Sequence, residues 1–264
     1  GFEAFLKKGT VTKGQKRIIL LGGSSIAWGV SAEKLSHELD VLTLNSGIHA
    51  STRYKNSFKL ISDVVDKDND LIVISPEYST VSESDFLNRS KEFCYIETFV
   101  KNTYPIKCLG YNTNHLFTSV ISLFRNQKLG LQREYTRSGF NEYGDYTHRI
   151  MGERNFSDVC VGWSINDLQK HYIPFFEKMV LEGYNIVYIP NFIPKTDCSD
   201  PGKVKIFHRI LFEKFGISPF LKADLLFDKE YFFNTSYHLT LDGVDMKSEI
   251  FLTQLRHHLN SENP

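Results

Sequence analysis

Hydrophobic and polar positions alternate along this chain in blocks that predict strands and helices in turn. Four continuous apolar runs have the length of buried strands, at residues 17–21, 41–44, 70–74 and 185–190. A run without polar alternation is typical of a strand that is covered on both faces of its sheet. Residues 223–227 form a fifth, weaker candidate strand.

Between these runs, apolar residues recur at helical spacing. Ser31 and Ser164 precede two of the predicted helices as candidate caps, and Pro174 interrupts the helix that ends near Gly183. The apolar faces contain Ala32, Leu35 and Leu39; Phe58, Ile61 and Val65; Leu168, Tyr172, Phe175 and Met179; Ile206, Ile210 and Phe215; and Val244, Phe251 and Leu255.

This alternation predicts an α/β fold: a doubly wound (flavodoxin-like), mainly parallel five-stranded sheet with helices on both faces. The alternation is lost over about 80–162, which we interpret as a long insertion after the third strand, over the carboxyl edge of the sheet. The remaining segments are enough for one core, so residues 1–264 are expected to form a single domain.

Residues of catalytic type follow the predicted strands. Ser24 comes directly after the first strand and its Gly-Gly turn, Gly47 follows the second, Glu77 follows the third, and His238 precedes the last helix. Open α/β sheets build their sites at the carboxyl ends of strands, so these positions are expected to converge. A serine, a small-residue loop and a histidine are the nucleophile, oxyanion donor and base that acyl transfer requires. The alternative is a Gly/Ser turn that only caps the next helix.

These segments, at residues 22–24, 45–47 and 237–240, resemble three sequence blocks of the SGNH (GDSL-like) hydrolase superfamily. The likeness is greatest to its divergent bacterial branch, which is associated with polysaccharide and cell-wall acylation. Gly23 stands where that family usually has Asp. The resemblance implies a serine-dependent acyl-ester hydrolase or O-acyltransferase that acts on an acetyl-type ester of a saccharide, through an acyl-serine intermediate and without a cofactor.

The resemblance also implies roles for single residues. Ser24 is the expected nucleophile and one oxyanion donor, with Ser25 as the alternative nucleophile; Gly47 supplies a second oxyanion N–H, and His238 is the base. The family's third block contributes an Asn that this chain lacks after its third strand, and Asn141 is our candidate replacement, the alternative being an ordinary turn residue.

The family's acidic residue before the histidine is also missing. Asn234 stands near that position and is expected to orient His238, unless a backbone carbonyl does so and leaves a Ser-His dyad. The alternative is that Asn234 only caps a turn. We place Glu77 and Arg53 on the substrate side, the alternative for Glu77 being a buried carboxylate that fixes loops. The two departures from the family pattern favour an alternative function, a catalytically impaired domain that binds a glycan or a protein partner.

Composition excludes several other classes. The formal net charge of +0 gives no basic field for nucleic acid, and no apolar run is long enough to span a membrane. The four cysteines form no CxxC pair and the histidines lack ligand spacing, so no metal site is expected, while the pairing of Cys94, Cys108, Cys160 and Cys198 stays open. The absence of a GxGxxG motif argues against a nucleotide-binding domain.

The expected partners are a small-molecule or glycan ester and, from the resemblance, envelope proteins that modify polysaccharides. Because the sequence begins at Gly1 and not at Met, we expect an upstream anchor or signal to have been removed, with an extracytoplasmic location. A cytoplasmic location is the alternative.

Overall fold

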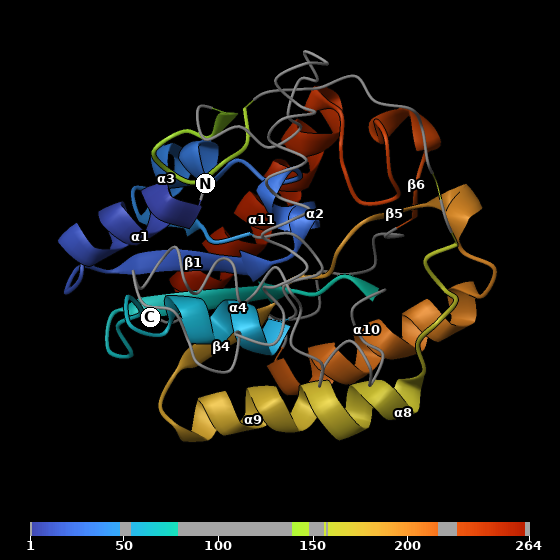
Figure 1. The fold of residues 1–264 in the computed structure, drawn as a ribbon, viewed down its shortest axis with the longest axis horizontal. Coiled ribbons are helices and arrows are strands. Elements are labelled where there is room, and N and C mark those ends of the chain that lie inside the picture. Colours follow the sequence, from blue (N-terminus) through green and yellow to red (C-terminus); the bar gives the residue numbers. More distant parts are fainter. Residues whose placement is uncertain are drawn as a thin grey trace, which may run out of the picture.

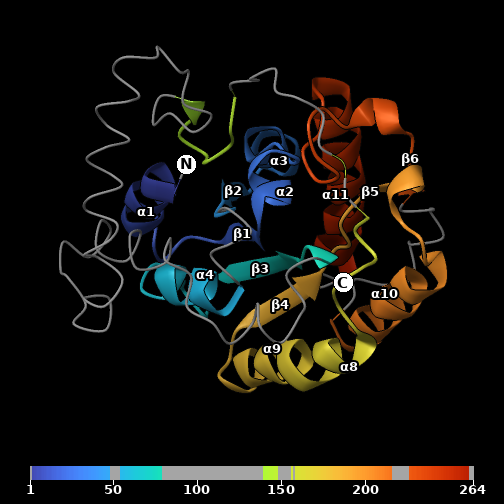
Figure 2. The same ribbon diagram turned by 45° about the vertical axis from the view of Figure 1, so that its right-hand side comes forward.

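The main sheet of this protein contains four parallel strands. The computed structural model describes residues 2–47, 54–78, 139–147, 156, 158–215 and 226–261. Within them the strands are β1 (Arg17–Gly22), β2 (Leu42–Asn45), β3 (Asp70–Ser75) and β4 (Asn185–Tyr188) (Figure 1), in the order β2-β1-β3-β4, which Figure 2 labels. The prediction of an α/β fold is therefore confirmed, as are the four strands predicted from the continuous apolar runs.

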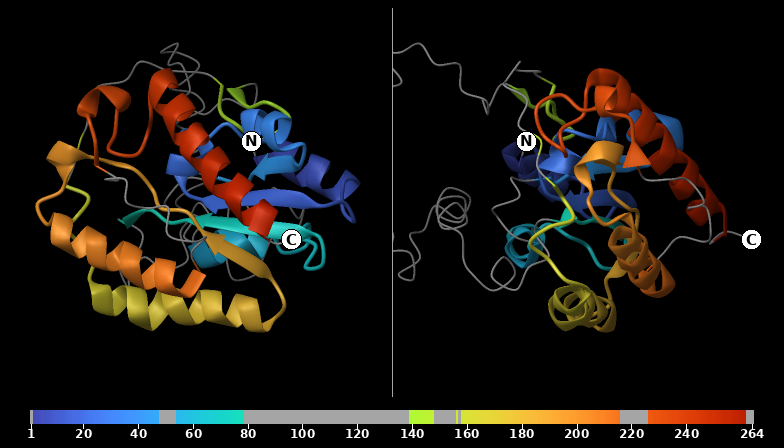
Figure 3. Two further views of the ribbon diagram at one scale, coloured as in Figure 1. Left: turned by 180° about the vertical axis from the view of Figure 1, so that it is seen from behind. Right: turned by 90° about the vertical axis from the view of Figure 1, so that its right-hand side faces the viewer.

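Helices cover both faces of this sheet, because alternate strand residues point to opposite sides. Ile18 and Leu20 pack with residues of α3 (Ala32–Leu39) and α11 (Leu241–Ser261), which crosses one face in Figure 3. Ile19 and Leu21 point the other way, into a larger cluster. The helices that contribute to that cluster are α1 (Phe2–Val11), α4 (Tyr54–Ile61), α9 (Ile173–Leu181) and α10 (Pro201–Phe215), of which α9 and α10 flank β4 in Figure 2.

A buried ion pair fixes the amino-terminal edge of the sheet. Arg17 and Asp70 are register partners on β1 and β3, and the guanidinium binds the carboxylate through two hydrogen bonds of 2.7 Å. The same guanidinium donates to the carbonyl oxygens of Gly9 and Val64, so it also joins α1 to the sheet. Removing one partner of such a pair typically costs about 3–5 kcal/mol, because the other charge stays buried.

Two features differ from the sequence-based expectation. The predicted fifth strand does not join the main sheet over the part that the structure describes: β6 (Leu226–Phe227) pairs instead with β5 (Ile193–Pro194) in a separate two-stranded sheet. Residues 223–225 and most of the predicted insertion lie outside the described residues. Helix α1 was not predicted, although Phe5 is fully buried on it.

The interruption predicted at Pro174 takes the form of a wider helical turn. A short helix, α8 (Ile165–Asp167), continues into a π-helical stretch (Leu168–Tyr172) directly before α9. Proline cannot donate the backbone hydrogen bond that a regular helix needs, and π-turns commonly absorb such a local defect. Ser164 caps this segment in a reciprocal box with Asp167, as its position predicted.

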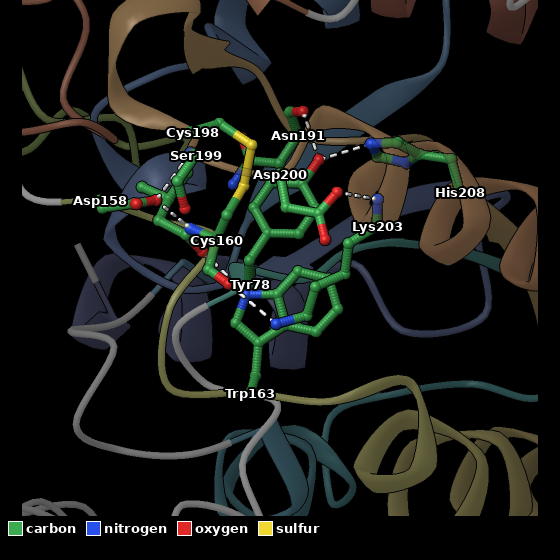
Figure 4. The surroundings of a disulfide bond; sticks show 11 residues. Tyr78, Asp158, Cys160, Trp163, Asn191, Cys198, Ser199, Asp200, Lys203 and His208 are labelled. Atoms are coloured by element: carbon green, nitrogen blue, oxygen red, sulfur yellow. Dashed lines mark hydrogen bonds between the residues drawn. A yellow bond between two sulfur atoms is a disulfide. The ribbon is translucent and has the colours of Figure 1, made fainter.

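A disulfide joins the segment before α8 to the segment before α10. Cys160 and Cys198, which are 38 residues apart, are bonded with their Cα atoms 5.0 Å apart (Figure 4). Asp158 accepts hydrogen bonds from the backbone N–H groups of Cys160 and Ser199, so both ends of the bridge are tied to one carboxylate. Cys94 and Cys108 lie outside the described residues.

We expect the double variant Cys160→Ser/Cys198→Ser to lose about 4 kcal/mol of unfolding free energy, the loop-closure value for a bridge of this span. Urea unfolding followed by circular dichroism measures the change. Each single variant should lose as much as the double variant, because either change breaks the same bond. Additive single losses, or an unchanged unfolding midpoint, would contradict the bridge.

Candidate active site

The loops after β1 and β2 pack tightly against each other. Ser24 opens the short helix α2 (Ser24–Ala27) directly after β1, and Gly47 comes two residues after the end of β2. A Cβ atom on Gly47 would lie 2.4 Å from the backbone nitrogen of Ala27, so only glycine fits there. The Asn45 amide nitrogen also donates to the Ile26 carbonyl oxygen at 3.0 Å. The structure therefore brings the first two predicted blocks into contact.

His238 lies against the same short helix. Its imidazole stacks on the indole of Trp28 with ring centroids 4.7 Å apart and an interplanar angle of 10°. Trp28 is the residue after α2, and its backbone N–H donates to the Ser24 carbonyl oxygen at 2.9 Å. Trp28 thus contacts both Ser24 and His238, which are more than two hundred residues apart in sequence.

Asn234 determines the orientation of the His238 ring. Its Oδ1 atom lies 2.8 Å from His238 Nδ1, and an amide oxygen only accepts, so Nδ1 carries the hydrogen. The neutral imidazole then has its lone pair on Nε2, the form that a general base requires. The backbone N–H of His238 donates to Thr235 Oγ1 at 3.1 Å, and Ser236 Oγ donates to Asp197 at 2.8 Å, which anchors the loop beside Cys198.

Glu77 lies beneath the turn formed by Gly23, Ser24 and Ser25 (the serine turn), in the position of the buried carboxylate that was predicted as the alternative to a substrate-side role. The residue is 1% exposed. Its Oε1 atom accepts hydrogen bonds from the Ser25 backbone N–H at 2.6 Å and from the Ser24 hydroxyl at 3.2 Å. A Cβ atom on Gly23 would lie 2.5 Å from the same oxygen, so the carboxylate fills the space of a side chain at position 23.

Lys247 contacts the serine turn from α11 and was not predicted from the sequence. It is buried on α11, and its Nζ donates to the Ser25 carbonyl oxygen at 3.0 Å and to Asn191 Oδ1 at 2.7 Å. Burial lowers the pKa of Lys247 to about 7, although the negative charge of Glu77 acts in the opposite direction. One feature of the sequence indicates that Lys247 is buried: it lies four and eight residues before Phe251 and Leu255, on the apolar face of the helix.

The other predicted site residues lie as follows. Ser25 is fully buried, and its hydroxyl has no hydrogen-bond partner among the described residues. Gly47 donates its N–H to Asn45 Oδ1 at 2.9 Å. The Asn141 amide nitrogen donates to Glu33 at 3.1 Å, and its amide oxygen accepts hydrogen bonds from the backbone N–H groups of Tyr143 and Asp145. These contacts are those of a turn residue and not of an oxyanion donor. Arg53 lies outside the described residues.

The imidazole of His238 belongs to a stack of aromatic rings, in which it contacts Trp28 and Phe233. Trp28 also stacks on Tyr146 at 4.0 Å and on Phe233 at 6.0 Å between ring centroids. Tyr146 belongs to the described part of the predicted insertion, where its backbone N–H donates to the Ala27 carbonyl oxygen. The stack therefore joins three segments: the loop after β1, the insertion and the histidine loop.

Within the described ranges, no group of three or more His, Cys, Asp or Glu side chains converges as metal ligands would. A search of the same ranges finds no helix with the length and hydrophobicity of a membrane span. Comparisons of the chain with protein-family models, with curated proteins and with solved structures find no match.

A second buried polar cluster begins at the next residue after Glu77. The hydroxyl of Tyr78 contacts His208 Nε2 and donates to the Asn191 carbonyl oxygen at 3.1 Å (Figure 4). The hydroxyl of Tyr188 contacts His208 Nδ1. Burial lowers the pKa of His208 to about 3 and raises the pKa of Tyr78 well above its ordinary value. Asn191 thus contacts both this cluster and Lys247.

We expect His208 to destabilise the fold in acid. Because its pKa falls from about 6.5 in the unfolded chain to about 3 in the folded protein, the unfolded chain binds the proton first as the pH falls. The stability associated with neutral His208 is complete above about pH 6.5 and is lost toward pH 3, by up to about 5 kcal/mol.

Urea unfolding at several pH values measures this slope. His208→Gln should flatten it over that window, whereas His257→Gln, at an exposed position of α11, should leave it as in the wild type. Equal slopes in the wild type and in His208→Gln would contradict the assignment.

Proposed function

We propose that this chain is a serine-dependent acyl-ester hydrolase or O-acyltransferase of the SGNH (GDSL-like) type, acting on an acetyl-type ester of a saccharide. The observation that carries the proposal is the position of His238: its ring stacks on Trp28, whose N–H is bonded to Ser24. A doubly wound sheet, with the site at its carboxyl edge, is the arrangement that this proposal requires.

In the proposed reaction, His238 Nε2 takes the proton of the Ser24 hydroxyl while Ser24 Oγ attacks the ester carbonyl. The tetrahedral oxyanion accepts hydrogen bonds from the N–H groups of Ser24 and Gly47. Its collapse breaks the ester C–O bond, His238 returns the proton to the leaving alcohol, and an acyl-serine remains. Water gives hydrolysis of this intermediate, and a sugar hydroxyl gives acyl transfer.

Burial favours Ser24 over Ser25 as the nucleophile. Ser24 retains 7% of its surface and Ser25 retains 0%. In the resting structure the Ser24 hydroxyl donates to Glu77, so the reaction requires it to rotate between staggered rotamers toward His238.

Glu77 compensates for the Asp that is missing from the first block, and this supports the resemblance. A carboxylate occupies the space beside Gly23, but it comes from the end of β3 and not from position 23. Under the proposed function, Glu77 supplies the carboxylate that the family's Asp supplies from the position of Gly23.

The substrate class and the location rest on two further observations. Trp28 and Tyr146 are buried in the stack and Phe233 is partly exposed beside it, so Phe233 is the ring of these three that offers a flat apolar surface to a sugar. The Cys160–Cys198 disulfide favours an oxidising, extracytoplasmic compartment, since such bonds are rare in the cytosol. The proposed partners are accordingly envelope proteins that modify polysaccharides.

A second candidate function is glycan or partner binding without catalysis. It is favoured by the amide at Asn234, which cannot stabilise an imidazolium as a carboxylate does, and by the Gly47 N–H, which already donates to Asn45. Under this alternative, an acetylated oligosaccharide binds in isothermal calorimetry but is returned unchanged.

We expect Ser24→Ala and His238→Ala to abolish hydrolysis of p-nitrophenyl acetate and labelling by a fluorophosphonate, which bonds to activated serines. Loss of a nucleophile or base typically reduces turnover by about 10⁴-fold or more. Ser25→Ala is the matched control and should be labelled like the wild type. Wild-type rates in both Ser24→Ala and His238→Ala would refute the proposal.

Asn234→Asp should raise the hydrolysis rate by about tenfold or more, because a carboxylate stabilises the imidazolium formed during the reaction more strongly than an amide does. Asn234→Ala, which removes the acceptor for Nδ1, should lower the rate. If the aspartate variant is no faster than the wild type across about pH 5–9 while it remains folded, His238 does not act as the base.

A further inference from the structure

We propose that Lys247 is a positioning residue for the candidate nucleophile: together with Glu77 it holds both polar backbone groups of Ser25 and so fixes the backbone that carries the Ser24 side chain. This inference rests on the proposed function for its catalytic meaning. We call the contacts of Glu77 and Lys247 with the Ser25 backbone the clamp. The clamp can be tested without catalysis.

The two charges act on opposite sides of one residue. Glu77 accepts the Ser25 N–H at 2.6 Å, and Lys247 donates to the Ser25 carbonyl oxygen at 3.0 Å. The first contact fixes the peptide plane between Ser24 and Ser25, and the second fixes the plane after Ser25. A backbone that is held in both planes fixes the position of the turn from which the Ser24 hydroxyl rotates toward His238.

The packing around Lys247 shows that its place is built into the fold. A Cβ atom on Gly29 would lie 3.3 Å from Nζ and 2.2 Å from the Ser25 carbonyl oxygen, so glycine is required for this approach. The rings of Phe192 and Phe251 lie 5.6 and 5.7 Å from Nζ. Asn191 Oδ1 also accepts a hydrogen bond from Nζ in the described chain, and it is neutral.

An amino group is costly in such surroundings, and the cost is offset by its partners. Desolvation disfavours the charged form, which agrees with the lowered pKa of Lys247, while Glu77 supplies the opposite charge. A purely structural role would be served as well by an apolar side chain of similar volume, because replacing a buried charge pair is often neutral for stability. The polar side chains of Lys247 and Glu77 are explained if their role is to fix the geometry of the serine turn.

The test compares Lys247→Met with the double variant Lys247→Met/Glu77→Gln, in which the buried site is again neutral. The control is Gln254→Met, a buried polar position on the same helix. Folding is checked by circular dichroism, and the double variant is used where the single variant does not fold. The probe is a rhodamine fluorophosphonate, with which Ser24 forms a P–O bond while fluoride leaves and the serine proton passes to His238.

We expect the maximal labelling rate to fall about 10²-fold, because the variants displace the serine turn. The half-saturating probe concentration should stay unchanged, because the surface that binds the probe is not altered. Hydrogen exchange of the Ser25 amide should become faster in the same variants. Gln254→Met should match the wild type in both measurements. An unchanged maximal rate in a folded Lys247→Met variant, or in the double variant, overturns the inference.

The proposed function and this inference fail in different ways. If Ser24 of the wild-type protein is not labelled, the proposed function is wrong, and the exchange measurement alone decides the clamp. Faster Ser25 exchange in the double variant then supports a clamped turn, and equal exchange overturns it.

Discussion

The burial of one carboxylate at the end of β3 is the constraint on which the candidate site depends. Glu77 is almost completely removed from water, so its oxygens need donors nearby. The Ser25 N–H and the Ser24 hydroxyl supply two of them, and the buried ammonium of Lys247 supplies a compensating charge. The absence of a side chain at Gly23 follows directly, because the carboxylate already occupies that volume.

The register of β1 against β3 places Ser24 beside Glu77. Gly22 on β1 is paired with Ser75 on β3, so Ser24 and Glu77 each come two residues after a paired position and meet across the strand ends. The opposite end of the same two strands is fixed by the Arg17–Asp70 pair. One strand pair is thus held by buried charges at both ends, and a shift in register would break both sets of contacts at once.

The four main strands could be predicted from the sequence because each is a short, continuous apolar run between glycine, proline or polar residues, a pattern too short for a buried helix and too apolar for a loop. Helix α1 was missed, since its contribution to the core depends on tertiary packing that a short segment does not reveal. The convergence of the loops after β1 and β2 followed from the expected parallel sheet. The direction of Glu77 did not, because a polar residue at a strand end can point to solvent or under the neighbouring turn.

Lys247 illustrates the same limit more clearly. A lysine between Asp245 and Glu249 has the appearance of a solvated helix position, and both of those acids do pair with Lys34 on α3. Only the spacing to Phe251 and Leu255 indicates the buried face. The partners of Lys247 come from distant parts of the chain, and so do the two cysteines of the disulfide; local pattern contains no information about such pairs.

The face-to-face contact between Trp28 and His238 has a consequence for charge. An indole presents its electron-rich face to whatever lies above it, and a cation in that position gains about 0.5–2 kcal/mol. A protonated imidazole over Trp28 would therefore be stabilised by the aromatic ring on one side while the Asn234 oxygen accepts its Nδ1 hydrogen on the edge. In a loop that lacks an acidic residue beside its histidine, the tryptophan is the group placed to hold a transient positive charge.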